Sequence, residues 1–394
     1  MNAGDYIKTI VIIGGGPSGM MAAISSKIHN PNGNVILVER NNKLGIKLRL
    51  TGGGRCNVTA DVTNQEVIAN TPKNGKFLFS SLSNFNPSQI KDFFEKEGCP
   101  LKVEDHGRVF PKSNKSIDII KVLIVKMKKL NIDIRLNTYV SSVNYEKKLI
   151  YTNNGDIGYN HLIIATGGKT YPATGSDGNG YDLVSKIGHS ITDLVPGEVP
   201  LVSNDKCIQS KALQGLSFKD VRIDIMNNNK IKQKIKHDLI FTHFGISGPV
   251  ALRASFYIQE LLKRKKEVLI YIDFIPSIDI NTLEAHSDNL EEYIMSLGIP
   301  KRLITYINDE FQNDLINKIK KFPLSIYSTR GFSQAFVTNG GISTKEIDPK
   351  TMKSKLINSV SFCGEIIDVS SFTGGYNITS AFSTGYTAGK YALK

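Results

Sequence analysis

The sequence has few of the residues that mark several common protein classes. Its 394 residues include no tryptophan and only four cysteines, Cys56, Cys99, Cys207 and Cys363, with no C-x-x-C pair. We therefore expect no disulfide scaffold, no bound metal, and a reducing, cytoplasmic location. No apolar run reaches about 18 residues, so we expect no transmembrane helix and no membrane partner. The N-terminal segment around Asp5 does not resemble a signal peptide.

Positive charge is in excess, because 49 lysines and arginines face 36 acidic residues and give a formal net charge of +13. Such an excess permits an anionic partner such as RNA but does not require one. Two basic segments contribute, an amphipathic helical pattern over 121–130 and the run Lys263–Lys266. Solvated surface is the plainer explanation for both. The absence of tryptophan weakens the RNA interpretation, since RNA-binding surfaces usually add aromatic side chains.

Glycine is abundant and clustered, and the first cluster is the most informative. The β-branched run Thr9–Ile13 predicts a buried strand, and it leads into Gly14-Gly15-Gly16-Pro17-Ser18-Gly19, which matches G-x-G-x-x-G. We expect a helix from Pro17 to about Lys27, then a second buried strand over 34–38 that ends at Glu39. Glu39 follows Gly19 by about 20 residues, the offset of an acid that binds ribose hydroxyls. The pattern predicts a dinucleotide site with its pyrophosphate at the helix N-terminus.

Three further segments favour FAD over NAD as the resident cofactor. A strand over 160–165 runs into Thr166-Gly167-Gly168, and a strand over 359–363 runs into Gly364-Glu365, with Asp368 just beyond. Gly374-Gly375-Tyr376-Asn377 then precedes a helix rich in small residues, from 378 to about 393, for which Asn377 is the expected N-cap. Contacts from both chain ends and the middle suit an extended FAD. No second G-x-G-x-x-G follows a strand, so NAD(P)H is expected only as a transient electron donor.

The segment Lys43–Thr59 resembles the K-x-G-x-K-x-x-x-(S/T)-G-G-G-R-C-N-x-T signature of the HI0933-like/BaiN-type flavoproteins, a family that includes aminoacetone oxidase and bile-acid-reductase-like members. Four other stretches agree with this resemblance, which spans nearly the whole chain: 107–111, 171–176, 241–249 and 338–342. Two departures concern the substrate rather than the flavin: Lys353 stands where the family usually has an acid, and Thr379-Ser380 replaces a common Gln-Trp.

The resemblance implies an α/β fold, a two-dinucleotide-fold-type FAD-binding Rossmann domain with an inserted β-rich and helical substrate region. The sequence allows the same division. Residues 1–192 and 335–394 would form the discontinuous cofactor domain, and residues 193–334 the insertion, β-rich over 193–275 and helical over 276–334, with a helical pattern clearest from 289 to 321.

The glycine loops, the acids and the family segment together give the predicted cofactor-binding residues. Among them, Lys47 and Arg55 are expected to neutralise phosphate or the charge that develops on the flavin. Surface cations are the alternative reading of these two residues. The full set is Gly14, Gly16, Pro17, Ser18, Gly19, Glu39, Arg40, Lys47, Gly53, Gly54, Arg55, Cys56, Thr166, Gly167, Gly364, Glu365, Asp368, Gly375, Tyr376 and Asn377.

Flavin chemistry requires little from acid–base side chains beyond one proton donor. Cys56, as a thiol acid, and His243, in a glycine-rich turn, are the candidate catalytic residues, with core packing as the alternative for Cys56. Tyr171 and Tyr376 are expected to stack on the flavin, to donate a hydrogen bond to it, or simply to cover a turn.

The expected function is that of an FAD-dependent oxidoreductase. It would move hydride through flavin N5 between NAD(P)H or an amine donor and an unsaturated small molecule or O2. One alternative is a flavin-dependent RNA-modifying reductase of the rRNA dihydrouridine synthase type. Another is a flavoprotein that has lost catalysis and serves as a binding module. The oligomeric state is not indicated by the sequence.

Overall fold

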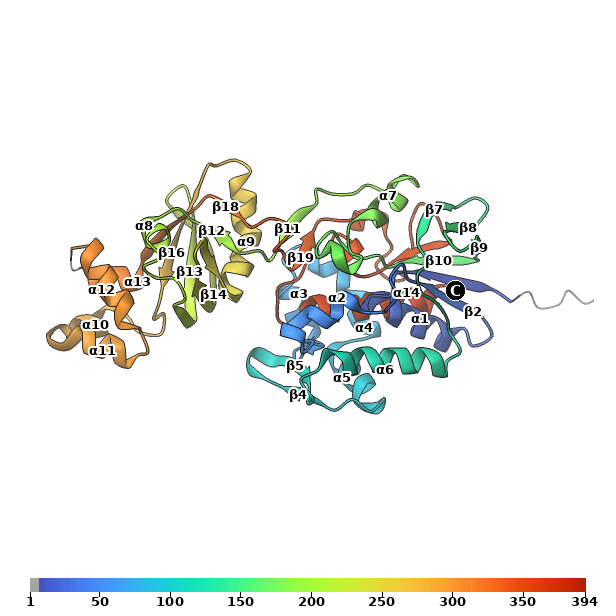
Figure 1. The fold of residues 1–394 in the computed structure, drawn as a ribbon, viewed down its shortest axis with the longest axis horizontal. Helices are drawn as coiled ribbons and strands as arrows, with labels where there is room; N and C mark the ends of the chain where they lie inside the picture. The colour runs from blue at the N-terminus through green and yellow to red at the C-terminus, as the bar shows by residue number, and fades with distance from the viewer. Residues whose placement is uncertain (1–6, 313) are drawn as a thin grey trace, which may run out of the picture. The chain divides into compact units, whose positions relative to one another are not determined.

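The computed structural model describes residues 7–312 and 314–394, which divide into two compact units. Unit 1 comprises the described residues up to Val195 together with Val337–Lys394, and unit 2 is Pro196–Phe336 (Figure 1). The expectation about the segment around Asp5 falls outside the described residues. None of the helices in the described ranges is long and apolar enough to span a bilayer.

A five-stranded parallel sheet forms the centre of unit 1. Its order is β20 (Val360–Phe362), β10 (His161–Ile164), β1 (Thr9–Ile13), β2 (Asn34–Val38) and β6 (Asp133–Arg135). The strands are short runs of mostly β-branched residues, and β1 is buried from Ile10 to Ile13 because helices cover both faces of such a sheet. The first strand lies in the middle, the order of a Rossmann-type domain.

The helices and smaller sheets of unit 1 pack around this sheet. The helix expected from Pro17 to about Lys27 is present as α1 (Pro17–His29). It begins at the expected residue and ends two residues later than expected. The helices are α1 (Pro17–His29), α2 (Ile46–Leu50), α3 (Asn64–Ala69), α4 (Phe79–Asn84), α5 (Pro87–Lys96), α6 (Ser116–Lys129), α7 (Asn179–Ser185) and α14 (Tyr376–Tyr391). The small sheets are β3 (Thr59–Ala60) with β5 (Arg108–Pro111) and β4 (Leu101–Val103), and β7 (Val140–Asn144) with β8 (Leu149–Thr152) and β9 (Ile157–Gly158). β11 (Val195–Gly197) pairs with β19 (Val337–Asn339), at the two points of the sequence where the chain passes between the units.

Helices α1 and α14 pack through glycine. A Cβ added at Gly385 would lie 2.3 Å from the Ser18 carbonyl oxygen, and one at Gly389 would lie 2.4 Å from the Ala22 carbonyl oxygen. Only a residue without a side chain lets two helix backbones approach this closely. The small residues of α14 therefore bring the C-terminal helix against the helix that follows the first glycine loop.

Unit 2 is built on a seven-stranded sheet with its own core. The order is β17 (Phe322–Ile326), β16 (Val268–Asp273), β13 (Ser217–Asn227), β14 (Lys230–Phe241), β15 (Gly245–Ser247), β12 (Leu201–Val202) and β18 (Ser328–Thr329). The helices are α8 (Lys206–Gln209), α9 (Pro249–Leu262), α10 (Ile280–Ala285), α11 (Leu290–Ser296), α12 (Lys301–Glu310) and α13 (Leu315–Lys320). The helical pattern over 289–321 is thus split into three helices. Gly298 in a left-handed conformation and Pro300 at the N-cap of α12 separate α11 from α12, and Gln312, also left-handed, lies between α12 and α13.

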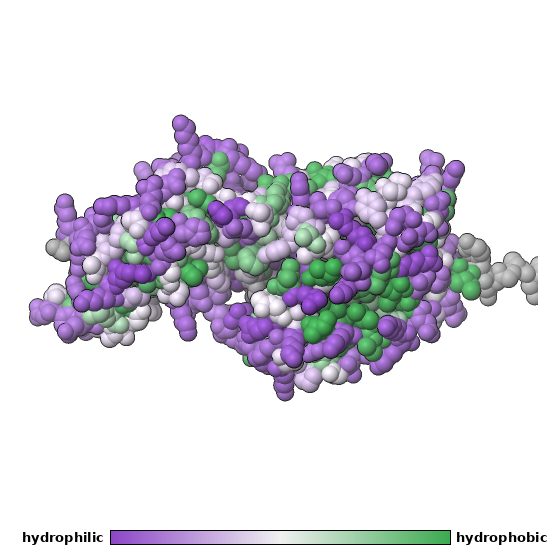
Figure 2. Space-filling model, in the orientation of Figure 1, coloured by the Kyte–Doolittle hydropathy of each residue, from purple (hydrophilic) through white to green (hydrophobic). Residues whose placement is uncertain are grey.

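The surface differs between the units on the face shown in Figure 2. Hydrophobic residues gather over the part of unit 1 where Figure 1 places α1, α2 and α4, whereas unit 2 is mostly hydrophilic on this face. All four cysteines are buried and free. Burial raises the pKa values of Cys56, Cys207 and Cys363 to about 12.

Acidification is expected to destabilise the protein through His161 in β10. Burial, with smaller contributions from Lys353 and Lys148, lowers the pKa of this imidazole to about 3, while Nε2 stays paired with Ser361 Oγ at 2.8 Å. The unfolded chain protonates near pH 6.5, so below that pH it binds one more proton than the folded state. The free energy of unfolding should therefore fall by about 1.4 kcal/mol per pH unit, or about 2 kcal/mol at pH 5.

Urea unfolding at pH 7 and pH 5 measures this effect. His161→Gln should make the pH dependence shallower by about that amount, whatever its effect on stability at pH 7. Equal pH slopes for the wild-type protein and the variant would contradict the assignment to His161.

Candidate functional site

The predicted cofactor segments of unit 1 follow the carboxyl ends of four parallel strands. Gly14–Gly19 follows β1, Glu39 follows β2, Thr166-Gly167 follows β10, and Gly364-Glu365 comes just after β20. In a parallel sheet these ends lie along one edge, where ligands bind at the point at which the strand order reverses. The fold thus places segments from across the sequence at one edge.

The glycine loop after β1 has little room for side chains. Gly14 has φ +109°, and a Cβ there would lie 2.4 Å from the Ala165 carbonyl oxygen, so it joins the ends of β1 and β10. A Cβ on Gly19 would lie 1.9 Å from the Gly14 carbonyl oxygen. The position of Gly364 is similar, since its Cβ would meet Ser18 Oγ at 2.3 Å. Gly14 and Gly19 are thus required for packing within the loop after β1, and Gly364 for packing against that loop.

Gly16 differs from its neighbours, because neither its backbone nor its surroundings require glycine. Its φ is −77°, which any residue adopts, and an added Cβ would meet nothing within 4 Å. It is the N-cap of α1, whose first turn has no side-chain cap and no acidic residue. A helix N-terminus with free N–H groups and an open approach fits the pyrophosphate of a dinucleotide.

Glu39 is held where β2 ends. Its Oε2 accepts the Gly15 N–H at 2.7 Å, and its Oε1 accepts the Asn41 backbone and side-chain N–H groups at 2.8 and 2.7 Å. The next residue, Arg40, forms an ion pair with Asp177 at 2.9 Å. Asn41 and Asp177 were missed by the sequence reasoning. Asn41 lies two residues beyond the acid, and only that proximity could have indicated it.

Lys47 and Glu365, which are 318 residues apart, form the central ion pair of the edge. The Lys47 ammonium lies 2.7 Å from Glu365 Oε2 and donates to Thr170 Oγ1 at 2.8 Å. Glu365 Oε1 accepts the Thr338 N–H at 2.8 Å. The network joins four segments: helix α2, the loop that follows β10, strand β19, and the loop that follows β20. Thr338 belongs to the glycine-rich stretch 338–342, whereas Thr170 has no comparable sequence signal.

Lys47→Met is expected to raise the dissociation constant for FAD about tenfold, equivalent to about 1.4 kcal/mol. The variant leaves Glu365 half-buried without its cation and removes a tie between α2 and the loop after β20. Lys47→Arg should restore most of the affinity. Flavin fluorescence quenching on titration of the apoprotein measures binding, with Lys76→Met, at an exposed lysine of the same unit, as the control. Equal losses of FAD affinity in Lys47→Met and in the control variant would refute a specific role of Lys47 in FAD binding.

The family segment turns sharply at its three glycines. Gly52, Gly53 and Gly54 are exposed with positive φ values, and a Cβ on Gly53 or Gly54 would meet nothing within 4 Å. Arg55 is paired with Glu104 at 3.0 Å and stacks on Phe110, 4.0 Å from the ring centre. It therefore has an acidic partner within the protein, as Lys47 does.

Cys56 is fully buried in the core of unit 1 with φ +63°. Its pKa of about 12 keeps the thiol protonated at neutral pH. Tyr171, in the loop after β10, is only half-buried, and burial raises its pKa as well. The Lys47 ammonium lies 6.0 Å from the centre of the Tyr171 ring.

The C-terminal part of the predicted site is held by contacts within unit 1. Gly375, with φ +97°, is the N-cap of α14, and a Cβ there would lie 2.5 Å from the Thr59 carbonyl oxygen. The prediction that Asn377 caps this helix is wrong, because the helix already begins at Tyr376. The Asn377 side chain instead bonds the backbone of Ser371, accepting at 3.0 Å and donating at 2.7 Å. Asp368 is buried and pairs with Lys73 at 2.8 Å.

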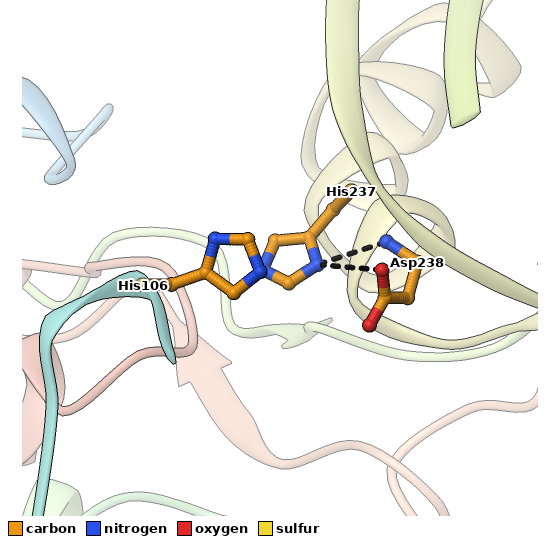
Figure 3. Close-up of side chains that lie close together, drawn as sticks. All are labelled: His106, His237 and Asp238. Atoms are coloured by element: carbon orange, nitrogen blue, oxygen red, sulfur yellow. Dashed lines mark hydrogen bonds and ion pairs between the residues drawn. The ribbon is translucent and has the colours of Figure 1, made fainter. Parts of the chain in front are cut away.

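His243, the second catalytic candidate, belongs to unit 2. It is exposed in the turn between β14 and β15 and lies edge-on to Phe244, 5.0 Å between ring centres. In the same unit, His237 Nδ1 accepts the Asp238 N–H at 2.8 Å and lies 3.9 Å from Asp238 Oδ1 (Figure 3). His106, also drawn there, belongs to a 3-10 turn of unit 1 (Asp105–Gly107). The sequence reasoning singled out neither of these two histidines.

Two buried hydroxyl groups near the loop after β10 lack partners. Within the described residues, neither Thr166 Oγ1 nor Ser176 Oγ has a hydrogen-bond partner. Gly180 and Gly167 adjoin them, since an added Cβ would lie 1.9 Å from Thr166 Oγ1 and 3.1 Å from Ser176 Oγ respectively. Together with the uncapped α1, the open side of Gly16 and the anchored acid Glu39, these orphaned donors fit a ligand rich in hydroxyl and phosphate oxygens, as FAD is.

The chain is similar to several characterised proteins. It is 27% identical over 385 residues to the 3-dehydro-bile acid delta(4,6)-reductase of Clostridium scindens, covering 91% of this chain and 92% of that one. It is also 27% identical over 377 residues to the ribosomal RNA dihydrouridine synthase of Escherichia coli, covering 90% of each.

Solved structures share the fold. The 3-ketosteroid-delta4-(5alpha)-dehydrogenase of Rhodococcus jostii matches with a TM-score of 0.55 at 14% identity, covering 100% of this chain and 98% of the other. The 3-ketosteroid delta1-dehydrogenase of Sterolibacterium denitrificans matches with a TM-score of 0.52 at 12% identity, covering 98% and 99%. The HI0933-like protein Rossmann domain matches residues 8–391. The chain therefore belongs to the HI0933-like family, and it is an oxidoreductase with FAD as its cofactor.

Proposed function

We propose that this protein uses NAD(P)H as a transient electron donor and reduces a carbon–carbon double bond conjugated to a carbonyl group in a small molecule. The observation that supports the proposal is the pair of names that two of its relatives carry. One relative is a delta(4,6)-reductase and the other a dihydrouridine synthase, and we interpret both names as reactions that saturate a double bond. In such a reduction one alkene carbon receives a hydride and the other receives a proton, while NAD(P)H is oxidised.

We assign the cofactor to the edge of unit 1 described above. The N-terminus of α1 with Gly16 would hold the pyrophosphate, and Glu39 the ribose hydroxyls. Lys47, Glu365 and the N-terminus of α14 at Gly375 would hold the flavin end, with the glycine turn 52–54 beside it. FAD, when bound, supplies hydride transfer at N5. Unit 2 is proposed as the substrate-side unit.

Tyr171 fits the role of proton donor better than Cys56. Its side chain is partly exposed, and its hydroxyl group is protonated at neutral pH, as in any tyrosine, with burial raising the pKa further. Cys56 lies in the core, where a substrate carbon has no access. Tyr171→Phe should slow turnover while flavin reduction by NAD(P)H stays unchanged, and Cys56→Ser should change stability more than turnover. The reverse pattern would restore Cys56 as the acid.

Anaerobic stopped-flow reduction of the bound flavin tests the proposal. NADH or NADPH should bleach the flavin, and an added enone should reoxidise it faster than buffer alone. Reduction by amines, or reoxidation by O2 alone, would indicate an oxidase instead. If NADH, NADPH and amines all fail to reduce the bound flavin, the protein is a non-catalytic flavoprotein.

A further inference from the structure

Arg330 of unit 2 is exposed, yet its side chain is held in place. The residue follows β18, and its backbone N–H donates to the Pro200 carbonyl oxygen at 3.1 Å. Its guanidinium group lies over the ring of Phe244, 4.7 Å from the ring centre, and its Nε donates to Gln334 Oε1 at 3.2 Å. Within the described residues, the two terminal nitrogens of the guanidinium group have no hydrogen-bond partner. They can therefore donate to a ligand.

The turn that carries Phe244 is fixed by its backbone. The Phe244 carbonyl oxygen accepts the Ser203 N–H at 3.1 Å. The next residue, Gly245, has φ +150°, and a Cβ there would lie 2.2 Å from the Leu201 carbonyl oxygen, so glycine is required where β15 meets β12. His243 packs edge-on against the same Phe244 ring. This turn belongs to the stretch 241–249, to which the cofactor assignment gives no role.

The positive charge of Arg330 is not offset by an acid. Among the residues that the structure describes, no ion pair involves Arg330. By contrast, the two cations of unit 1 that we expected near the flavin, Lys47 and Arg55, each have a glutamate partner. A guanidinium group stays protonated in proteins and donates in a fixed planar geometry. Arg330 thus offers full charge and free N–H groups to a ligand oxygen.

We propose that Arg330 holds the carbonyl oxygen of the substrate and stabilises the negative charge that develops on it. The inference rests on the proposed function, in which unit 2 is the substrate-side unit. In that reduction the β-carbon receives the hydride, the π electrons shift onto the carbonyl oxygen to give an enolate, and the α-carbon then takes a proton as the carbonyl re-forms. A donor that is already fixed and charged stabilises this oxygen strongly, because it needs no reorganisation during the reaction.

A carboxylate or phosphate elsewhere on the substrate is the other oxygen ligand that a guanidinium group would bind. We favour the carbonyl oxygen, because the reaction creates charge there in every turnover and both expected cations of unit 1 are already paired. The two assignments differ in kinetics. A contact with a remote anion strengthens binding before and during the reaction alike, whereas a contact with the enolate oxygen mainly accelerates the chemical step.

Anaerobic stopped-flow kinetics on the FAD-loaded protein tests the proposal, with 2-cyclohexenone as a probe that carries no carboxylate or phosphate. Arg330→Gln should slow flavin reoxidation at saturating enone about 100-fold or more, the usual loss for one oxyanion donor, while flavin reduction by NAD(P)H stays unchanged. Phe244→Leu keeps the charge but removes the ring, and it should slow reoxidation about tenfold. The matched control is Arg302→Gln, at an exposed arginine of unit 2 that donates only to the Gln214 carbonyl oxygen, and it should have less than a twofold effect.

Binding of 4-nitrophenolate, a stable analogue of the enolate, gives a second measurement that needs no turnover. Its absorbance on titration of the oxidised, FAD-loaded protein reports the dissociation constant. Arg330→Gln should raise this constant at least tenfold, and Arg330→Lys, which keeps the charge, should recover part of the affinity. Arg302→Gln should bind the phenolate as the wild-type protein does. Flavin absorbance and thermal unfolding check that each variant is folded.

Three outcomes would overturn the proposal: equal phenolate affinity in the wild-type protein and Arg330→Gln, equal losses in Arg330→Gln and Arg302→Gln, or an effect of Arg330→Gln only on the enone concentration that gives half-saturation. Phenolate binding that depends on Arg330, in a protein whose reduced flavin the enone does not reoxidise, would retain the oxyanion site and lose the proposed function. Enone reduction that is indifferent to Arg330 would retain the proposed function and lose this inference.

Discussion

Gly19→Ala is expected to yield a colourless protein that neither retains FAD nor binds it again on titration. The new Cβ would lie 1.9 Å from the Gly14 carbonyl oxygen, which is backbone and cannot rotate away. The loop after β1 must then move off the N-terminus of α1. We expect the free energy of unfolding of the apoprotein to fall by about 2–3 kcal/mol, the range of overpacked cores.

Gly16→Ala is the matched control, since it adds the same methyl group three residues away. Its φ of −77° suits alanine and its Cβ meets nothing, so the stability of the apoprotein should not change. If the pyrophosphate binds there, FAD affinity should still fall at least tenfold, by about 1.4 kcal/mol or more. Urea unfolding and FAD titration separate the two effects. Unchanged FAD affinity in Gly16→Ala would move the pyrophosphate away from α1.

Gly389→Ala is expected to lower the free energy of unfolding by about 3 kcal/mol, although alanine is the better helix former by about 1 kcal/mol. The added methyl group would lie 2.4 Å from the Ala22 carbonyl oxygen and 2.7 Å from the Ser26 nitrogen, so α1 and α14 must separate. Because α1 also carries the pyrophosphate end of the proposed site, FAD binding should weaken as well.

The direction in which Gly389→Ala changes stability shows whether close helix packing or helix propensity dominates at this position. In an isolated peptide covering Tyr376–Tyr391, the same substitution should raise the helix content measured by circular dichroism. In the intact protein it should lower the urea midpoint. A stabilised intact protein would show that the α1–α14 contact can relax and that the glycines of α14 serve another purpose.

Local sequence patterns predicted the parts of the fold that depend on neighbouring residues. Strands β1 and β2 lie over the expected residues. In an α/β protein, a short β-branched run that ends at glycine or an acid usually forms a buried strand. The start of α14 was misjudged by this same local reasoning. Asparagine is a good N-cap, but Gly375 reaches a left-handed conformation more easily and Asn377 found partners in the preceding loop.

Pairings between distant segments could not be read from the sequence. Lys47 and Arg55 were expected at the cofactor because they flank three glycines, and nothing local showed that Glu365 and Glu104 would be their partners. An ion pair across 318 residues depends on how strands from both ends of the chain enter one sheet. The roles of the cofactor-binding and catalytic residues therefore stay predictions, which the experiments above address.

The burial of the thiols affects how well the protein resists oxidation by the peroxide that its flavin can produce. A reduced flavin that meets O2 releases peroxide, and peroxide attacks thiolates that it can reach. Cys56 and Cys363 are fully enclosed in unit 1, and with pKa values of about 12 almost none of either is thiolate. Self-inactivation during aerobic turnover should therefore leave these cysteines unmodified in a mass-spectrometric map, and oxidative damage should appear first at exposed methionines such as Met295.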